Sequence, residues 1–271
     1  MPVREPLAAP SGLLAFLRRR RRVRVAGYTW RLPPGGDKGL AERLRRRWRR
    51  ELLEAILPKE EGKEFGHVID AGAGWGESMI DLAHTARRTR YVGFEPDARR
   101  AEYANELAWA NGFQLRVTPA ALTAQATVLR LPGGESRPRL AAGLPFDALR
   151  HEVAPGPIRL VNINAGGAEL GVLQGMRATL SSDRPLLLAD VRFAGAGGPD
   201  EERRRKEGMQ EILAELCYVI MQLVITVQWD FVGGARMREF PLAAGTAAGG
   251  NQCQYLMAPK EEMTRLGRVL F

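Results

Sequence analysis

The 271-residue sequence predicts an α/β fold built on a largely parallel, doubly wound sheet. Short apolar stretches alternate with amphipathic ones from residue 67 to residue 216, a pattern typical of strands that alternate with helices. A glycine-rich turn, GAGWG, joins the first of these strands to the first of these helices. With 45% hydrophobic and 26% charged residues, the chain can bury a substantial core.

The composition excludes several classes of protein. The two cysteines, Cys217 and Cys253, are too few for a disulfide framework and lack the paired spacing of a zinc site. No apolar run reaches the ~18 residues that a membrane-spanning helix needs, and the start of the chain lacks the charge order of a signal peptide. We therefore expect a cytoplasmic protein with reduced thiols, and the sequence implies no metal.

Positive charge is concentrated at the start of the chain. Residues 1–50 hold 15 Lys and Arg against 3 Asp and Glu, whereas the remainder holds 25 against 28. The arginines form two clusters, Arg18–Arg24 and Arg43–Arg50. Such clusters attract polyanions, so nucleic acid and anionic membrane surfaces are candidate partners. The alternative is a solvated face in a chain that is rich in arginine.

Residues 1–60 are expected to form a basic segment ahead of the main domain at 61–271. This segment should contain a short helix over 11–22, a strand over 23–31 and an amphipathic helix over 38–57. In the second helix, apolar residues recur at every fourth position and predict one buried face. These residues are Leu40, Leu44, Trp48, Leu52 and Ile56.

In the main domain, each strand is expected as a short β-branched or apolar run and each helix as an amphipathic stretch between two runs. The expected strands are 67–71, 91–95, 115–118, 126–131, 158–163 and 185–191. The expected helices are 77–88, 98–111, 146–152, 169–180 and 200–216. Two β-rich runs, 217–231 and 252–259, then suit an antiparallel pair that closes a mixed sheet.

The run VIDAGAGWGE, from Val68 to Glu77, carries the clearest chemical signal. A buried strand ends in an acid and opens into glycines that precede a helix. Glycines let the backbone approach a ligand closely, and a helix N-terminus favours polar or anionic groups. The spacing differs from the dinucleotide fingerprint and suits a nucleoside with a carboxylate-bearing tail better than a pyrophosphate.

The neighbouring strand strengthens this interpretation because it ends in YVGFEP. Glu95 follows the glycine-rich turn by about 20 residues, the distance at which an acid accepts both hydroxyls of a ribose. Two carboxylates and a glycine turn at adjacent strand ends predict a nucleoside pocket at the open edge of the sheet.

The chain resembles the FkbM-type S-adenosylmethionine-dependent methyltransferases from about Val23 to Val191. The resemblance is carried by VIDAGAGWG, by FEP, by Asn105 and Asn111-Gly112 with the following PAAL, and by INAGGAELGVLQG with the later RPLLLAD. It implies a class I methyltransferase, Rossmann-like fold with a mixed seven-stranded sheet and helices on both faces. It also implies a cofactor, S-adenosyl-L-methionine.

The resemblance assigns the cofactor site residue by residue. Asp70 and the turn glycines would line the methionine moiety, Glu95 would bind the ribose, and Ala121 would lie near the adenine. The full expected cofactor site is Asp70, Gly72, Ala73, Gly74, Gly76, Glu95, Pro96 and Ala121.

The fourth-strand motif departs from the family pattern. The family usually reads I-D-V-E-G, whereas this chain has Asn164 and Gly166 at the two acidic positions. An amide can orient a ligand but cannot take a proton, so another residue must serve if the reaction needs a base. The candidate catalytic residues are Asn164, His151, Glu169 and Asp190.

These observations favour an O-methyltransferase that acts on the hydroxyl of a sugar or a natural-product small molecule. Two alternatives stay open. The basic N-terminal segment fits a nucleic-acid methyltransferase, whose binding would weaken steeply with salt. The loss of the fourth-strand acids fits a protein that binds S-adenosylmethionine without catalysing a reaction.

Overall fold

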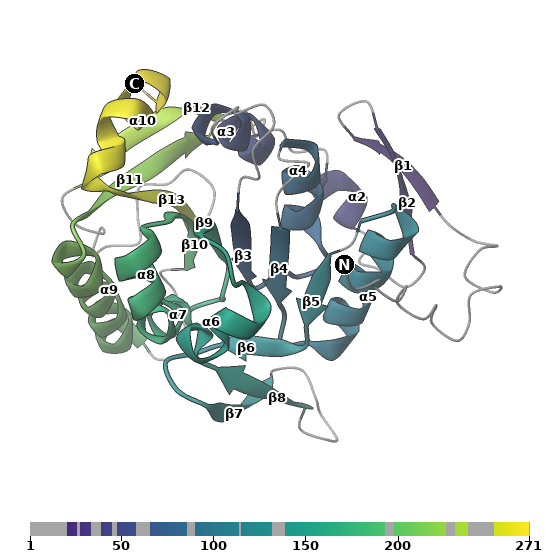
Figure 1. Ribbon diagram of the computed structural model, residues 1–271, viewed down its shortest axis with the longest axis horizontal. Coiled ribbons are helices and arrows are strands. Elements are labelled where there is room, and N and C mark those ends of the chain that lie inside the picture. Colours follow the sequence, from purple (N-terminus) through teal and green to yellow (C-terminus); the bar gives the residue numbers. More distant parts are fainter. Residues whose placement is uncertain are drawn as a thin grey trace.

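The computed structural model describes residues 21–25, 28–33, 39–44, 48–57, 66–85, 90–113, 115–131, 139–192, 198–225, 231–237 and 252–270. Its centre is an eight-stranded sheet (Figure 1). In chain order the strands of this sheet are β3 (His67–Ala71), β4 (Arg90–Phe94), β5 (Arg116–Thr118), β9 (Ile158–Ile163), β10 (Leu186–Arg192), β11 (Tyr218–Ile225), β12 (Phe231–Met237) and β13 (Gln252–Pro259).

Five of these strands run parallel in the order β5-β4-β3-β9-β10. Numbered along the chain, this is the doubly wound order 3-2-1-4-5. β13 then pairs antiparallel with both β10 and β11, and β12 forms the edge beyond β11. The arrangement confirms the expected mixed, class I methyltransferase-like sheet. It has eight strands instead of seven: the run expected over 217–231 contains β11, and β12, which begins at Phe231 and continues to Met237, was not expected.

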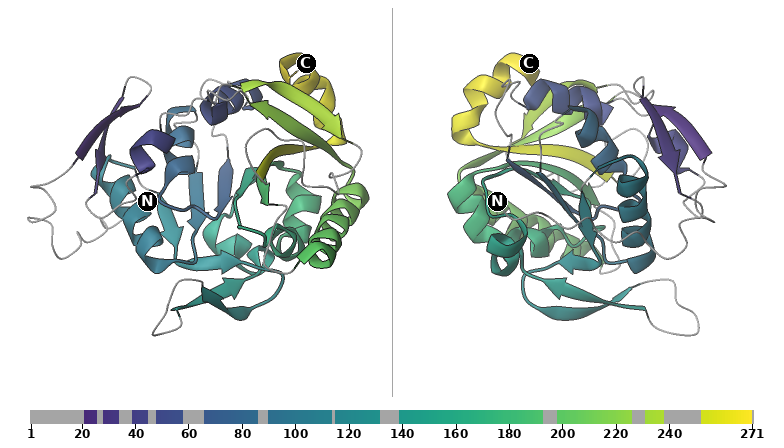
Figure 2. Two further views of the ribbon diagram at one scale, coloured as in Figure 1. Left: turned by 180° about the vertical axis from the view of Figure 1, so that it is seen from behind. Right: turned by 45° about the vertical axis from the view of Figure 1, so that its right-hand side comes forward.

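Helices cover both faces of the sheet, as expected (Figure 2). One face is covered by α3 (Trp48–Ile56), α4 (Glu77–Thr85), α5 (Ala98–Ala110) and α10 (Met263–Leu270). The other is covered by α6 (Phe146–Val153), α7 (Glu169–Gly175), α8 (Arg177–Asp183) and α9 (Gly198–Glu215). Successive side chains of a strand enter opposite layers: Val68 joins the first and Ile69 the second. β3 is therefore buried at every position.

The start of the described chain differs from the expectation. In place of a helix over 11–22 and one strand over 23–31, the described residues form an antiparallel hairpin of β1 (Arg21–Val25) and β2 (Tyr28–Leu32). Residues 11–20 lie outside the described part. Val23 and Val25 are buried between exposed arginines, and this two-residue period favours a strand.

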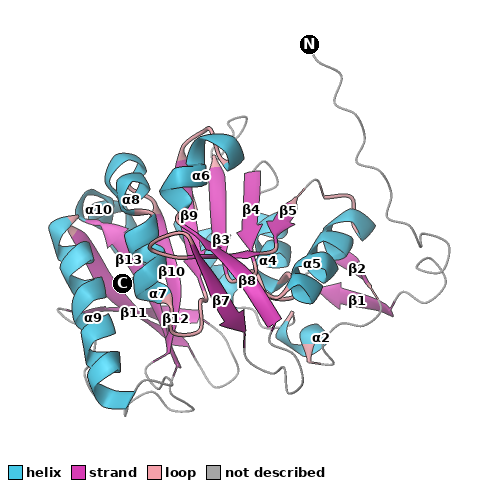
Figure 3. Cartoon of the chain, turned by 90° about the horizontal axis from the view of Figure 1, so that it is seen from below, coloured by secondary structure: helices cyan, strands magenta, loops and turns pink. Residues whose placement is uncertain are grey.

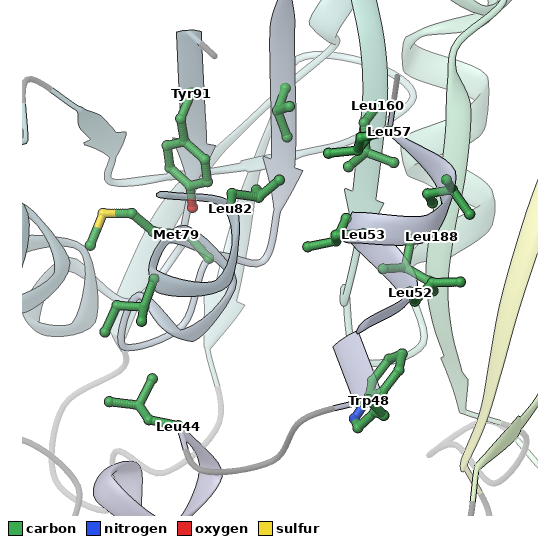
Figure 4. Close-up of a cluster of buried hydrophobic side chains, with 14 of the residues drawn as sticks. Leu44, Trp48, Leu52, Leu53, Leu57, Met79, Leu82, Tyr91, Leu160 and Leu188 are labelled. Atoms are coloured by element: carbon green, nitrogen blue, oxygen red, sulfur yellow. The ribbon is translucent and has the colours of Figure 1, made fainter. Parts of the chain in front are cut away.

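The helix expected over 38–57 is found as α2 (Leu40–Arg43) and α3, and its apolar stripe is buried as expected. On α3, Leu52 belongs to one hydrophobic cluster with Leu160 of β9 and Leu188 of β10 (Figure 4). The described residues before residue 60 therefore share a hydrophobic core with the central sheet.

A second, three-stranded sheet lies beyond the carboxyl ends of β4 and β5 (Figures 1 and 3). Its order is β6 (Ala120–Leu122), β8 (Arg139–Leu144), β7 (Thr127–Leu131). The strand expected over 126–131 corresponds to β7, whereas β6 and β8 were not expected. The small sheet follows β5 directly, so it borders the edge at which a nucleoside site is expected.

The helix expected over 169–180 is broken at Met176 into α7 and α8. The carboxylate of Asp147, from α6, accepts the backbone N–H groups of Ala178 (2.8 Å) and Thr179 (3.0 Å). This side chain satisfies amides that a helix start leaves without partners, so it explains the break.

The C-terminal helix α10 was not expected from the sequence either. No helix among the described residues is long and apolar enough to cross a membrane.

Candidate functional site

The candidate site lies where β3 and β9 end side by side. The chain leaves β3 for α4 on one face and leaves β9 for α7 on the other. This divergence makes the topological switch point at which ligands bind in open α/β sheets. The Asn164 N–H donates to the Ala71 carbonyl (2.8 Å) across it. A Cβ on Gly72 would lie 2.1 Å from the Asn164 carbonyl oxygen, and Gly72 has φ +95°, so only glycine fits there.

The glycine-rich turn closes over the end of β4. The amides of Gly72 (2.8 Å) and Ala73 (3.0 Å) both donate to the Phe94 carbonyl, and the amide of Gly76 donates to the Ala73 carbonyl (2.9 Å). The Trp75 amide donates to the Glu77 carboxylate (3.1 Å). These amides are therefore engaged within the protein. The turn owes its shape to glycine, and it reserves few N–H donors for a ligand.

Glu95, just past β4, contacts the glycine turn that follows β3, so it lies beside that turn as the sequence predicts. It lies one residue beyond β4, is 5% exposed, and accepts the amides of Gly74 (2.9 Å) and Asp97 (3.0 Å), one on each carboxylate oxygen. Burial raises the pKa of Glu95, although both amide hydrogen bonds oppose the shift. A carboxylate oxygen has two lone pairs, so each oxygen can accept one further hydrogen bond.

Pro96 and Ala121 follow the ends of the neighbouring strands β4 and β5, which the Glu95 amide links by donating to the Thr118 carbonyl (3.0 Å). Pro96 separates Glu95 from Asp97, whose carboxylate caps α5 at the Arg99 amide (3.0 Å) and pairs with Arg139 of β8 (2.7 Å). Ala121 is half-buried in β6, immediately past the third strand. The residues expected at the ribose and at the adenine thus lie past the ends of two neighbouring strands.

One aromatic residue of the turn was not expected to matter. Trp75 is half-buried and packs edge-to-face on Tyr103 of α5, with ring centroids 5.1 Å apart. The Arg100 guanidinium lies 5.8 Å from the centroid of the Trp75 ring. In the sequence, the available signal was the tryptophan inside GAGWG. Its contacts anchor the turn to α5, in addition to the hydrogen bonds that anchor the turn to β4.

The carboxylate of Asp70 points into the protein interior. It accepts the Tyr91 hydroxyl (2.5 Å) and the Asn162 side-chain amide (2.7 Å), and the residue is completely buried. Burial raises the pKa of Asp70, and the hydrogen bonds from Tyr91 and Asn162 oppose that shift. The structure therefore places the Asp70 side chain beneath the switch point, in contact with two side chains that the sequence did not single out.

Three of the four candidate catalytic residues lie at the switch-point edge. Asn164 is exposed just past β9, and Asp190 is half-buried near the end of β10. Glu169 opens α7, is 2% exposed and accepts the Gly167 amide (2.8 Å). Burial raises the pKa of Glu169; the nearby Arg205 opposes this shift and the nearby Asp190 adds to it.

His151 is placed at the opposite edge of the sheet. It is exposed in the last turn of α6. The adjacent Arg150 pairs with Asp183 (2.7 Å), and Asp183 accepts the Ile158 amide at the first residue of β9 (2.8 Å). Because Ile158 marks the amino end of that strand, the structure separates His151 from the other candidates.

The second arginine cluster is partly internal. Arg49 donates to Ser78 (3.2 Å) and Asn162 (3.1 Å), and Arg50 approaches Asp81 (4.0 Å) with 11% of its side chain exposed. Arg45 to Arg47 and Arg18 to Arg20 lie outside the described residues. Two arginines of the expected polyanion surface are therefore used inside the protein.

No protein-family model matches the chain. A stretch of 61 residues, 22% of this chain, is 36% identical to part of cyclosporin synthetase from Tolypocladium inflatum. The matched part is a very small share of that protein, 0% of its length after rounding. The methyltransferase FkbM from Methylobacillus flagellatus has a similar structure, with a TM-score of 0.47 and 18% identity. The match covers 75% of this chain and 47% of that one, so the chain spans less than half of its length.

Two further solved structures are similar at lower identity. Fibrillarin from Aeropyrum pernix, crystallised with S-adenosyl-L-methionine, has a TM-score of 0.47 and 13% identity over 89% of this chain and 83% of that one. An rRNA methylase from Streptococcus thermophilus has a TM-score of 0.44 and 12% identity over 78% and 93% of the two chains.

Proposed function

We propose that this chain is an S-adenosylmethionine-dependent methyltransferase that methylates a hydroxyl group of a small molecule such as a sugar or a natural product. The observation that carries the proposal is the contact between Glu95 and Gly74 at the switch point. A carboxylate at the end of β4 and a glycine turn at the end of β3 meet at the edge where a nucleoside binds.

The residues at this edge fit the cofactor chemically. The two oxygens of Glu95 retain acceptor capacity for the two ribose hydroxyls. Among the described residues, a Cβ on Gly74 would meet only the Glu77 carboxylate oxygen within 4 Å, at 3.2 Å, so the turn leaves space on that side. The glycine turn from Gly72 to Gly76 would leave room for the amino-acid part beside Gly74, and Pro96 and Ala121 would flank the adenine.

Bound there, S-adenosylmethionine supplies an electrophilic methyl group for in-line displacement. The chain must align the acceptor hydroxyl and take its proton. Asn164 is exposed and suited to orienting the acceptor, but a neutral amide cannot take the proton. We assign the base role to Asp190, because it is half-buried near the end of β10, whereas Glu169 is almost wholly buried.

Calorimetric titration of S-adenosylhomocysteine into the full chain tests the cofactor assignment. We expect micromolar binding to the wild type and a loss of about 10- to 100-fold in Glu95→Gln, because a hydrogen bond to a charged group contributes about 1.5–3 kcal/mol. Glu102→Gln is the matched control, since Glu102 is exposed on the neighbouring α5. Absence of binding to the wild type would refute the proposal.

The acceptor class needs a separate assay. Radiolabelled methyl transfer to a panel of hydroxylated small molecules should give product with the wild type and about 100-fold less with Asp190→Asn, the size of a general-base contribution. Tight cofactor binding without product on any hydroxyl acceptor would contradict O-methylation.

A non-catalytic scaffold is the second candidate, favoured by Asn164 and Gly166 at the positions where the family carries acids. A Cβ added at Gly166 would meet none of the described residues within 4 Å, so a longer side chain has room there. The positive φ of Gly166, +64°, would cost that side chain about 1–2 kcal/mol of backbone strain. If loss of the acids disabled the site, Asn164→Asp combined with Gly166→Glu should create activity in a chain that otherwise only binds the cofactor.

A further inference from the structure

A buried polar network lies between α3 and the sheet, directly beneath the switch point. The Asp70 carboxylate accepts the Tyr91 hydroxyl (2.5 Å) on one oxygen and the Asn162 amide (2.7 Å) on the other. Arg49 of α3 donates from one guanidinium nitrogen to Asn162 Oδ1 (3.1 Å) and to Ser78 Oγ of α4 (3.2 Å). Asp70, Asn162 and Ser78 are all buried, with 0%, 3% and 7% of their surface exposed.

Each of the three central strands contributes one member of this network. Asp70 lies on β3 and pairs in register with Asn162 of β9. On the other side Asp70 pairs with Gly93 of β4, and a Cβ on Gly93 would lie 3.0 Å from the Tyr91 hydroxyl. The missing side chain at Gly93 therefore lets the Tyr91 ring extend along β4 as far as Asp70.

Arg49 reaches the network because α3 is anchored by its apolar face. Leu52 and Leu53 are 0–1% exposed and belong to the same hydrophobic cluster as Val68 of β3 and Leu160 of β9 (Figure 4). This packing fixes the helix over the strands, and the arginine near its start then points at their polar side chains.

The network members precede the site loops by very few residues. Asp70 is two residues before Gly72, and Asn162 is two residues before Asn164. Between them the Asn164 amide donates to the Ala71 carbonyl (2.8 Å). A site is held in its productive geometry by groups that lock the residues of its first layer. Movement of Asp70 against Asn162 would displace both loops.

We propose that Arg49 is a positioning residue for the cofactor site, acting through Asn162 and Asp70 on the glycine turn. The proposal rests on the proposed function for the identity of the ligand. It gives part of the basic N-terminal segment an internal role: one of its arginines completes the support of the nucleoside pocket.

The test compares Arg49→Met with Arg50→Met in the full chain. Arg50 is the matched control, because it is adjacent on α3 and approaches Asp81, at 4.0 Å, where Arg49 contacts Asn162. For Arg49→Met we expect the Kd for S-adenosylhomocysteine to rise about tenfold or more, because the loss of one hydrogen bond from a charged group corresponds to at least about a tenfold change in an equilibrium constant. Arg50→Met should change the Kd less than about threefold, and Arg49→Lys should recover part of the affinity.

A second readout does not depend on any ligand. Hydrogen–deuterium exchange of the free protein should be faster in peptides covering residues 72–76 for Arg49→Met, and unchanged there for Arg50→Met at matched thermal stability. If the wild type binds no S-adenosylhomocysteine, the proposed function fails while the exchange data still decide the positioning role. The positioning role of Arg49 would be overturned if Arg49→Met and the wild type showed equal exchange and equal affinity. It would also be overturned if Arg49→Met and Arg50→Met had equal effects.

A milder variant keeps the test decisive if Arg49→Met does not fold. Ser78→Ala removes one acceptor of Arg49 and retains helix propensity on α4. We expect a smaller change in the same direction, a few-fold in affinity and in exchange of residues 72–76. Wild-type values for both Ser78→Ala and Arg49→Lys would overturn the proposal.

Discussion

We expect Gly93→Ala to reverse the usual effect on stability of replacing a glycine in a strand. Glycine inside a strand is normally unfavourable by about 0.5–1 kcal/mol relative to alanine, and no positive φ makes alanine strained at this position. However, a Cβ there would lie 2.9 Å from Tyr91 Cε1, 3.0 Å from its hydroxyl and 2.9 Å from Val117 Cγ2. We therefore expect the substitution to destabilise the protein.

The magnitude follows from two costs. Overpacking at this site costs about 1–3 kcal/mol. Displacing the Tyr91 ring also breaks the hydrogen bond to Asp70 and leaves a buried carboxylate oxygen unsatisfied, which costs a further ~1–3 kcal/mol. The free energy of unfolding should thus fall by about 2–6 kcal/mol. Tyr91→Phe, which removes only the hydroxyl, should lower it by about 1–3 kcal/mol.

Urea unfolding of both single variants and the double variant checks this reasoning. Both substitutions remove the same hydrogen bond, so the double variant should lose less than the sum by about 1–3 kcal/mol. Gly234→Ala in β12 is the control, because a Cβ there meets none of the described residues closer than 3.9 Å, and its stability should stay equal or rise. A stabilised Gly93→Ala, or strictly additive effects, would refute the role assigned to Gly93.

Three further outcomes are expected. Burial raises the pKa of Asp81 to about 7, against 3.8 in the unfolded chain, so between these pH values the folded state binds one more proton than the unfolded state. In urea unfolding, the stability of the wild type relative to Asp81→Asn should therefore fall as the pH rises from about 4 to 7. Parallel pH profiles of the two proteins would contradict this. Gly72→Ala should abolish soluble expression, because its Cβ would lie 2.1 Å from the Asn164 carbonyl oxygen; a soluble variant with wild-type stability in urea would contradict this. Asn105→Ala should lower the unfolding free energy by about 2–4 kcal/mol in urea, because Asn105 bonds both the N–H and the carbonyl of Val117 (2.8 Å each); a loss below about 1 kcal/mol would contradict this.

Most of the parallel part of the fold was predictable from the sequence because its longer strands are short runs in which apolar residues predominate. β3 and β9 match the expected strands at both ends, and β10 and α9 differ from the expectation by one or two residues. These strands are buried on both faces, so their signal does not depend on how neighbours are arranged. The same reasoning located Glu95 beside the glycine turn, since parallel strands end at one edge.

The errors have a different physical origin. The break between α7 and α8 depends on Asp147, which lies about 30 residues earlier in the chain and caps α8 from α6. The short strands β6 and β8 pair with each other in parallel, with β7 against the other side of β8. Neither the cap nor the pairing is encoded by a local period, so a pattern read along the sequence could not find them.

The position of Asp70 shows how strand alternation separates the two acids of the nucleoside motif. Side chains two residues apart on a strand point to the same face, and Val68 is buried in the layer beneath α3 and α4. Asp70 must then enter the same layer, where Tyr91, Asn162 and ultimately Arg49 satisfy it. Glu95 escapes this constraint because it lies beyond the end of β4.

The two acids therefore have different physical tasks, although both end a strand in the sequence. Asp70, inside β3, supports the switch point from below, and its substitution should act through the loops that follow. Glu95, one residue past β4, lies at the edge of the sheet, where we propose that it meets the ligand itself. On this reasoning Asp70→Asn, which keeps the Tyr91 contact, should weaken S-adenosylhomocysteine binding less than Glu95→Gln does, and calorimetry showing the reverse order would place the Asp70 carboxylate in direct contact with the ligand.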